Sequence, residues 1–169
     1  MNIKIIYWPQ GGHVEQVAKK LETKLTATKA FCVEDLDFNM LKDTDLLIMG
    51  GSTVGSDDWK NAPYTDAWAK FFAELREKGI SMEGKKVALY GLGNQMLYPF
   101  HFVDGMKHMA DAVQESGAEL IGQCENKGYH FNASEALVDG LFVGLPLDED
   151  TEASKTDARL DAWLKTLGL

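Results

Sequence analysis

Along the chain, short runs of consecutive apolar residues alternate with longer stretches in which apolar residues recur every three or four positions. The runs at 3–8, 45–51 and 86–91 are almost continuously apolar, which is typical of strands buried on both faces of a sheet. Glycine or proline lies at the end of each run and interrupts the strand pattern. A weaker strand is expected near 30–34, and a further strand begins at 118–122.

Helices are expected between these runs. Apolar residues at helical spacing predict them at about 14–25, 63–78, 102–116 and 156–167. Strands that alternate with amphipathic helices form parallel sheets with helices on both faces, joined by right-handed crossovers. The pattern therefore predicts an α/β fold with a doubly wound parallel sheet.

Length and composition indicate how many domains the chain forms. The chain has 169 residues, of which 45% are apolar and 25% charged, the proportions of an ordinary globular domain. A polar and aromatic stretch at 124–139 interrupts the pattern, and strand character resumes at 141–145. The sequence contains no internal repeat, low-complexity tract or linker. We expect a single domain spanning 1–169.

Charge narrows the class of partner. The formal net charge of −9 excludes nucleic acid, whose phosphates require a basic protein surface. It suits proteins with a basic docking surface, because complementary charge speeds encounter, although acidity that serves only solubility is the alternative. No stretch approaches the ~20 apolar residues of a membrane span, so we expect no membrane insertion. A monomer is expected.

Cysteine and histidine usage points to an intracellular protein without a metal. Cys32 and Cys124 lie far apart, which favours free thiols and a reducing compartment. The histidines have no cysteine or acidic residues at metal-ligand spacing, so no metal site is expected. Residues 1–8 have the pattern of a strand and not of a signal peptide. We expect a cytoplasmic location.

Three loops at 9–14, 52–62 and 92–102 follow the carboxyl ends of predicted strands. Ligands of such sheets bind at this edge, where the strand order reverses. In the first loop, Gly11 and Gly12 lead into a helix, whose free N–H groups attract anions such as phosphate. Pro9 has no N–H, so the backbone donors begin at Gln10, and His13 adds a side-chain donor. A tight turn without a ligand is the alternative.

The second and third loops carry aromatic residues that can enclose a flat ring. Trp59, Tyr98, Phe100 and Phe102 are available for stacking, which contributes about 0.5–1.5 kcal/mol for an aromatic pair beyond area burial. Ordinary packing is the alternative for each ring. It has particular weight for Phe102, which lies on an apolar helix face.

At these loops the chain resembles the flavodoxins, specifically the long-chain type, over nearly its whole length. Residues 91–99, GLGNQMLYP, are similar to the G-x-G-D-Q-x-x-Y-P loop of that family. Residues 139–148, DGLFVGLPLD, resemble its D-G-K-F-x-G-L-x-L-D segment, and 156–159 with Trp163 resemble its closing helix. The stretch at about 123–140 is similar to the insertion that splits the fifth strand in long-chain members.

The resemblance implies a five-stranded sheet of order 2-1-3-4-5 that binds FMN non-covalently and carries single electrons between redox proteins. It implies that Tyr98 stacks on the outer face of the flavin and that Asn94 and its neighbours line the pyrimidine edge. Asp148 is expected near the ribityl chain and phosphate. The residues expected at the cofactor are Pro9, Gln10, Gly11, Gly12, His13, Val14, Ser52, Thr53, Val54, Gly55, Gly93, Asn94, Tyr98, Phe102 and Asp148.

Two departures from the family pattern affect this expectation. The family's phosphate loop, T-x-T-G-x-T, offers three hydroxyls, whereas the matching residues here are Pro9, Gly11 and Val14. Val54 stands where the family has a tryptophan on the inner flavin face, and Trp8 or Trp59 could replace that indole. Gly55 takes the position whose peptide is expected to flip with the redox state of the flavin. We expect weaker FMN binding, with His13 as partial compensation.

The expected function is a low-potential one-electron carrier and not an enzyme. Acidic neighbours disfavour negative charge on the reduced flavin and so lower its potential. Those neighbours are expected to be Asp57, Asp58, Asp104 and Asp148. The alternatives are a flavodoxin-like binding module with weakened or lost FMN binding, and a flavin reductase of a small substrate in which His13 or His101 supplies a proton.

Overall fold

The computed structural model describes residues 1–26, 28–53 and 67–169. Several sequence predictions lie outside these described residues. They concern Val54, Gly55, Asp57, Asp58, Trp59 and the helix start at Pro63.

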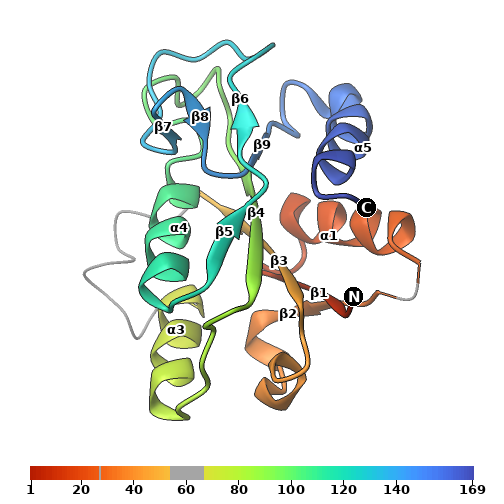
Figure 1. The fold of residues 1–169 in the computed structure, drawn as a ribbon. Helices are drawn as coiled ribbons and strands as arrows, with labels where there is room; N and C mark the ends of the chain where they lie inside the picture. Colours follow the sequence, from red (N-terminus) through yellow and green to blue (C-terminus); the bar gives the residue numbers. More distant parts are fainter. Residues whose placement is uncertain (27, 54–66) are drawn as a thin grey trace.

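A parallel sheet forms the centre of the molecule (Figure 1). Its strands are β1 (Ile3–Tyr7), β2 (Ala30–Cys32), β3 (Leu46–Ser52), β4 (Lys86–Leu92) and β5 (Glu119–Ile121). Their order is β2-β1-β3-β4-β5, with every pair parallel, so the predicted order 2-1-3-4-5 is confirmed. β1 lies between β2 and β3. The first crossover leads from β1 to β2 on one side, and the next leads from β2 to β3 on the other side of β1. The strand order therefore reverses at β1.

Two separate strands pair with successive halves of β4. β5 pairs with Lys86–Ala88, and β9 (Leu145–Leu147) pairs with Tyr90–Leu92, both parallel. A small antiparallel sheet of order β6-β8-β7 lies between them in the chain. Its strands are β6 (Cys124–Glu125), β7 (Leu137–Val138) and β8 (Leu141–Phe142). β9 brings its carboxyl end beside that of β4, at the edge where a ligand is expected.

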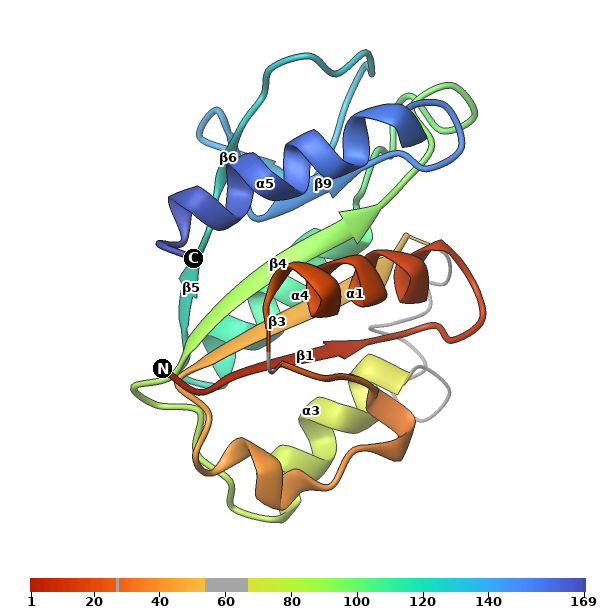
Figure 2. The same cartoon turned by 90° about the vertical axis from the view of Figure 1, so that its right-hand side faces the viewer.

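Helices cover both faces of the sheet (Figures 1 and 2). α1 (His13–Lys24) and α5 (Thr156–Thr166) lie on one face, and α3 (Ala67–Glu77) and α4 (Gly105–Glu115) lie on the other. Short 3-10 turns complete the described elements at Val33–Asp35, Phe38–Leu41 and Ala153–Lys155. Among the described residues, no helix combines the length and apolar character that crossing a bilayer requires.

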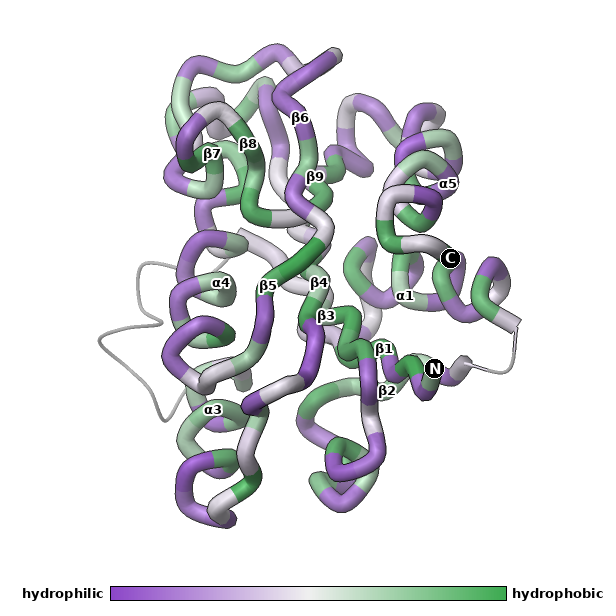
Figure 3. Tube along the Cα trace, in the orientation of Figure 1, coloured by the Kyte–Doolittle hydropathy of each residue, from purple (hydrophilic) through white to green (hydrophobic). Residues whose placement is uncertain are grey.

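The sheet separates two apolar cores, as expected for strands buried on both faces. Figure 3 shows this pattern, with apolar residues along the central strands and polar residues on the outer helices. Tyr90 is fully buried and lies across Gly50 on the neighbouring strand. A Cβ at Gly50 would lie 1.8 Å from the Tyr90 ring, so only glycine fits at this crossing.

α4 begins at Gly105, three residues later than the sequence predicted. The segment before it is held by the insertion, because the N–H groups of Asn132 and Ala133 donate to the Pro99 carbonyl at 2.6 and 2.9 Å. The N–H of Phe102 donates to the Ala133 carbonyl at 3.3 Å. These contacts hold the segment before α4 against the insertion, and the helix begins only after it.

Candidate functional site

A cavity of about 640 Å³ lies at the carboxyl ends of β1, β3, β4 and β9. Its volume is within the range of small-molecule sites, and its position is the switch point of the strand order. Four chain segments supply its lining residues. They are Pro9, His13 and Val14; Ser52 and Thr53; Leu92, Gly93, Asn94, Tyr98, His101 and Asp104; and Glu149 and Asp150.

Asn94 shapes the loop that forms one wall of the cavity. Its Oδ1 accepts the N–H groups of Met96 and Leu97 at 3.0 and 2.8 Å, and its Nδ2 donates to Asp150 at 3.0 Å. Its carbonyl accepts the N–H of Tyr98 at 3.0 Å. Asparagine favours such local turns because its short side chain reaches the next backbone groups. The turn holds Tyr98 at the cavity with its side chain 61% exposed.

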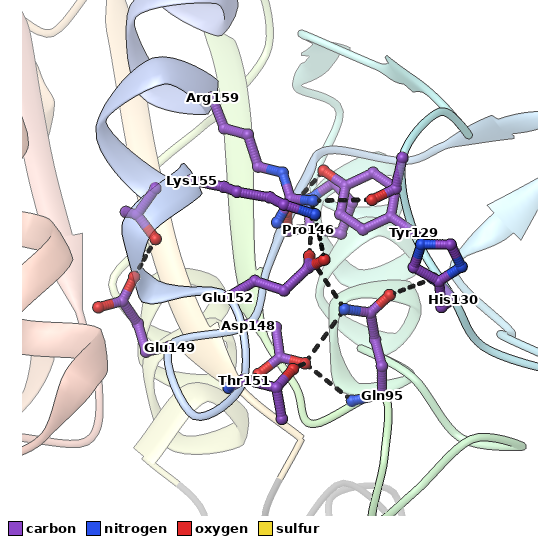
Figure 4. Close-up of polar contacts among 12 residues, drawn as sticks. Gln95, Tyr129, His130, Pro146, Asp148, Glu149, Thr151, Glu152, Lys155 and Arg159 are labelled. Carbon is purple, nitrogen blue, oxygen red and sulfur yellow. Dashed lines mark hydrogen bonds and ion pairs between the residues drawn. The ribbon is translucent and has the colours of Figure 1, made fainter.

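Gln95 joins this loop to two other segments (Figure 4). Its Nε2 donates to Asp148 and to Glu152, both at 3.1 Å, and its Oε1 accepts the N–H of His130 at 2.5 Å. His130 belongs to the insertion, and the two acids lie between β9 and α5. A single amide side chain therefore fixes the cavity wall against both neighbours.

Asp148 is fully buried beneath the cavity wall. Its carboxylate accepts the N–H of Gln95 at 3.0 Å, the N–H of Thr151 at 2.9 Å and the hydroxyl of Thr151 at 2.6 Å. Burial alone would raise the pKa of Asp148, but these hydrogen bonds outweigh it and hold the pKa below its ordinary value. The carboxylate is an ionised anchor for the loop after β9.

Arg159 of α5 completes this network. Its guanidinium lies 2.7 Å from Glu152 and 4.2 Å from the centre of the Tyr129 ring, over its face. The Tyr129 hydroxyl donates to the Pro146 carbonyl at 2.9 Å. Burial would raise the pKa of Glu152, but Lys155, Arg159 and Gln95 together hold it below its ordinary value. The network ties the insertion to the strand and helix beside the cavity.

The first turn of α1 forms the opposite end of the cavity. Gly11 has a φ of +82°, a conformation that glycine adopts without strain. Its N–H donates to the Glu15 carboxylate at 2.6 Å, and Glu15 also pairs with Lys19 at 2.7 Å. The Tyr90 hydroxyl donates to the Val14 carbonyl at 2.9 Å and fixes this turn to the sheet. No side chain caps the helix at Gly12.

Tyr7 reinforces the position of Glu15. Burial raises the pKa of the Tyr7 phenol to about 12, and the nearby Glu15 carboxylate adds to the rise. The Lys19 ammonium and the Gly11 N–H in turn lower the pKa of Glu15. Glu15 is therefore an anion held at the start of α1 by the protein itself.

Apart from the Tyr98 phenol, the ionisable side chains among the described lining residues are carboxylates and histidines. The acids are Asp104, Glu149 and Asp150. His13 lies 3.6 Å from Asp150, and His101 lies 2.9 Å from the buried Asp104. No lysine or arginine is among the described lining residues.

The structure brings most of the sequence-predicted site residues together at this cavity. They are Pro9, His13, Val14, Ser52, Thr53, Gly93, Asn94 and Tyr98. Gln10, Gly11 and Gly12 belong to the same loop but do not line the cavity. Val54 and Gly55 lie outside the described residues. Trp8, a candidate to replace the family's inner tryptophan, is half-buried and packs against the two cores.

Two further predicted site residues do not line this cavity. Phe102 is fully buried, with its ring centre 5.2 Å from Phe131 and 5.8 Å from Tyr129, so it belongs to the core beside the insertion and not to the cavity. Asp148 does not line the cavity either, because its carboxylate is turned inward to Gln95 and Thr151. The insertion in the first case and the loop hydrogen bonds in the second determine these positions.

The sequence analysis missed Leu92, Glu149 and Asp150 as lining residues. Leu92 was assigned only to the start of a loop, whereas it is the last residue of β4. Glu149 and Asp150 directly follow the carboxyl end of β9, which lies beside that of β4. The rule that ligands bind beyond the carboxyl ends of parallel strands points to these positions once β9 is recognised as part of the sheet.

The cavity fits the ring of a flavin better than its phosphate. Tyr98 offers an exposed aromatic face, and the backbone N–H of Asn94 has no hydrogen-bond partner among the described residues. At the α1 end, by contrast, Pro9, Gly11 and Val14 have no hydroxyl, and the Gly11 N–H is already bonded to Glu15. The residues present suit a flat, hydrogen-bonding ring system held at the sheet edge.

Comparison with known proteins agrees with the fold. The sequence model of the flavodoxin family matches residues 5–163. A flavodoxin of Klebsiella pneumoniae is 34% identical, with 98% of this chain and 96% of that protein covered. The crystal structure of Fusobacterium nucleatum flavodoxin bound to flavin mononucleotide is 26% identical and superposes with a TM-score of 0.83, covering 99% of this chain and 96% of that one. The chain belongs to the flavodoxin family.

Proposed function

We propose that this protein binds FMN non-covalently and carries single electrons between redox proteins. The observation that carries the proposal is the cavity of about 640 Å³ at the carboxyl edge of a flavodoxin sheet, with the exposed Tyr98 ring at its wall. The similar flavodoxin of Fusobacterium nucleatum is bound to flavin mononucleotide, which supports the same cofactor here. A bound flavin would supply reversible one-electron chemistry.

The chain's own residues hold and orient the ring. Tyr98 covers one face, since aromatic rings favour offset stacking. The Asn94 N–H is available for an acceptor on the pyrimidine edge, and the Asn94 turn fixes its direction. Thr53 at the end of β3 is itself anchored to the Leu92 carbonyl at 2.9 Å and forms a rigid floor. Because these groups are fixed before binding, little ordering is needed when the ring enters.

The carboxylates around the cavity favour a low reduction potential. Asp104, Glu149 and Asp150 line it, and the ionised Asp148 lies beneath. Negative charge added to a bound ring is disfavoured by neighbouring carboxylates, more strongly where water is excluded. Potentiometric titration should therefore give a lower potential for the second electron when bound flavin is compared with free flavin.

Partners are proposed to dock around the same edge. Met96, Leu97, Tyr98 and Phe100 are each more than half exposed and surround the cavity wall. The net charge of −9 adds long-range attraction to redox proteins with basic docking surfaces. The same net charge opposes self-association, so we propose a monomer. Cys32 and Cys124 are free thiols, which suits a cytoplasmic location.

We also propose that the chain is a long-chain flavodoxin with a single domain. The segment between β5 and β9 carries the antiparallel sheet β6-β8-β7, at the place where long-chain members have an insertion. The Trp163 Nε1 of α5 donates to the Gly122 carbonyl at 2.8 Å, and Arg159 donates to the Gly128 carbonyl at 3.1 Å. These contacts support folding of the insertion with the rest of the chain as one unit.

Electron transfer to a basic acceptor tests the function. The FMN-loaded protein is reduced under argon and mixed in a stopped-flow instrument with ferric cytochrome c, a basic haem protein. We expect oxidation of the flavin and reduction of the haem in matched one-electron amounts. Protein without flavin is the control. Flavin that stays reduced in the presence of excess acceptor would contradict the proposal.

A small-substrate flavin reductase is the second candidate. It is favoured by His101, which is 70% exposed at the cavity and lies 2.9 Å from the buried Asp104. Such a pair can deliver a proton to a bound substrate. Turnover of a quinone with NADH by the FMN-loaded protein would support this candidate, and His101→Gln should then lower the rate. A carrier shows no such turnover.

A further inference from the structure

We propose that this cavity recognises a flavin by its ring and sugar chain and not by its phosphate, so that riboflavin binds about as well as FMN. The inference rests on the proposed function and concerns the ligand class of the same site. Three features of the cavity support it, and one, the start of α1, opposes it.

The loop between β1 and α1 has no side-chain hydroxyl for a phosphate. Residues 9–14 are Pro, Gln, Gly, Gly, His and Val. Pro9 also has no N–H, and it lines the cavity itself. Each hydrogen bond to a charged group contributes about tenfold or more in affinity, so a loop without these donors forgoes a large part of phosphate binding.

A carboxylate of the protein already uses one donor of this loop. The Gly11 N–H donates to Glu15 at 2.6 Å, and the second carboxylate oxygen of Glu15 pairs with Lys19 at 2.7 Å. Lys19 is therefore paired within the helix by Glu15. A phosphate bound here would have to displace the Glu15 carboxylate from the Gly11 N–H or lie beside its negative charge.

The opposite wall carries further negative charge. Glu149 and Asp150 line the cavity on the side of β9, and His13 lies 3.6 Å from the Asp150 carboxylate. The His13 ring, which could face a phosphate, thus already lies beside an acid. Among the described lining residues, no lysine or arginine offsets these acids.

The remaining attraction is the start of α1. The N–H groups of the first turn carry the equivalent of about half a positive charge and remain without a side-chain cap. A phosphate ester would carry nearly two negative charges, and it would be repelled by Glu15 at the α1 end and by Glu149 and Asp150 on the β9 side. The helix terminus therefore roughly balances the repulsion, and little net affinity is left for the phosphate.

Calorimetry with both ligands tests the inference without any substitution. Protein freed of flavin is titrated with FMN and, separately, with riboflavin at low ionic strength. We expect dissociation constants within about tenfold of each other, whereas a site with phosphate donors would favour FMN by much more. Affinity for FMN should also rise with added salt, which screens the long-range repulsion between the phosphate and the protein's net charge of −9, while riboflavin affinity stays unchanged.

The outcomes separate the two proposals. If FMN binds more than tenfold tighter than riboflavin, the inference is overturned while the proposed function stands. If neither ligand binds, the proposed function is overturned and the inference with it.

Two variants sharpen the comparison by creating a preference for phosphate. Val14→Thr keeps the shape of the side chain and adds a hydroxyl at the start of α1, where Val14 lines the cavity. Glu15→Gln removes the carboxylate charge beside Gly11. Each should raise the ratio of FMN affinity to riboflavin affinity about tenfold. The ratio of the two affinities is the readout, because a general loss of structure weakens both ligands alike. An unchanged ratio in both variants would overturn the inference.

Discussion

At the scale of single residues, the site depends on side chains that organise a loop before any ligand enters. Asn94 makes the turn, and Gln95 joins it to the insertion and to the loop after β9. Tyr98 is left exposed as a consequence, although a large aromatic ring is usually buried. An exposed ring on a fixed loop indicates a contact surface for a ligand.

Tyr98 can be tested directly. Tyr98→Ala should weaken FMN binding by roughly 2- to 10-fold, the loss of one stacking contact. Tyr98→Phe keeps the ring and should bind FMN as the wild type does. Because the side chain is 61% exposed, neither substitution should change the midpoint of thermal unfolding by more than a degree or two. Fluorescence titration of FMN measures the affinity, and equal binding by the two variants would exclude the stacking role.

The residue scale is also where prediction from sequence was least complete. The motif around Asn94 and Tyr98 identified the cavity wall correctly because turn chemistry is local. Phe102 was placed at the cofactor as a ring available for stacking, and Asp148 because it ends the segment 139–148 that resembles a family motif. Their side chains point away from the cavity, because the Phe102 ring packs against Phe131 and the Asp148 carboxylate accepts a hydrogen bond from Gln95. Such partners come from segments 29 and 53 residues distant in the chain, and spacing alone does not reveal them.

At the scale of elements, β9 decides the shape of the site. β9 pairs with the carboxyl-terminal half of β4. The residues that follow it, Glu149 and Asp150, therefore lie at the cavity. The sequence predicted the strands, helices and their order well, because buried parallel strands have a simple apolar pattern. The start of α4 and the use of Leu145–Leu147 in the sheet depend on contacts made by the insertion.

Asp148 should link the stability of this element to pH. Its folded pKa is lowered, so its contribution is present above the pKa of an unfolded aspartate, about 3.9, and is lost as pH falls through the folded value. Asp148→Asn should lower the unfolding free energy by about 2 kcal/mol at pH 7. In acid, the unfolding free energies of the variant and the wild type should become equal. Urea unfolding across pH 7 to pH 3 measures this.

A matched control lies on α5. Asp161 is an exposed aspartate that pairs with Lys24 across two helices at 2.7 Å. Asp161→Asn should cost less than about 1 kcal/mol, as exposed ion pairs do. If Asp148→Asn lowers the unfolding free energy no more than Asp161→Asn does, the loop after β9 is not anchored by a buried charge.

At the scale of the whole molecule, charge and shape favour transient docking. The chain carries a net charge of −9, and exposed apolar side chains gather on the loop at 96–100. A small apolar contact within an acidic field gives fast encounter and fast release, which suits a carrier.

Raising the ionic strength should therefore slow electron transfer to a basic acceptor. Between about 20 and 300 mM salt the second-order rate with ferric cytochrome c should fall at least tenfold, because the Debye length shortens from about 20 Å to about 6 Å. A small neutral acceptor is the control, and its rate should change little. Equal salt sensitivity for both acceptors would remove the case for acidic docking.

The proposed function requires that the cavity at the carboxyl edge of the sheet holds a flavin. The most direct measurement is a visible absorption titration of the flavin-free protein with FMN, monitored between 350 and 550 nm. We predict a saturable shift of the flavin bands at one equivalent, with quenched flavin fluorescence as Tyr98 stacks on the ring. A spectrum that remains the sum of protein and free FMN at every ratio would contradict the account.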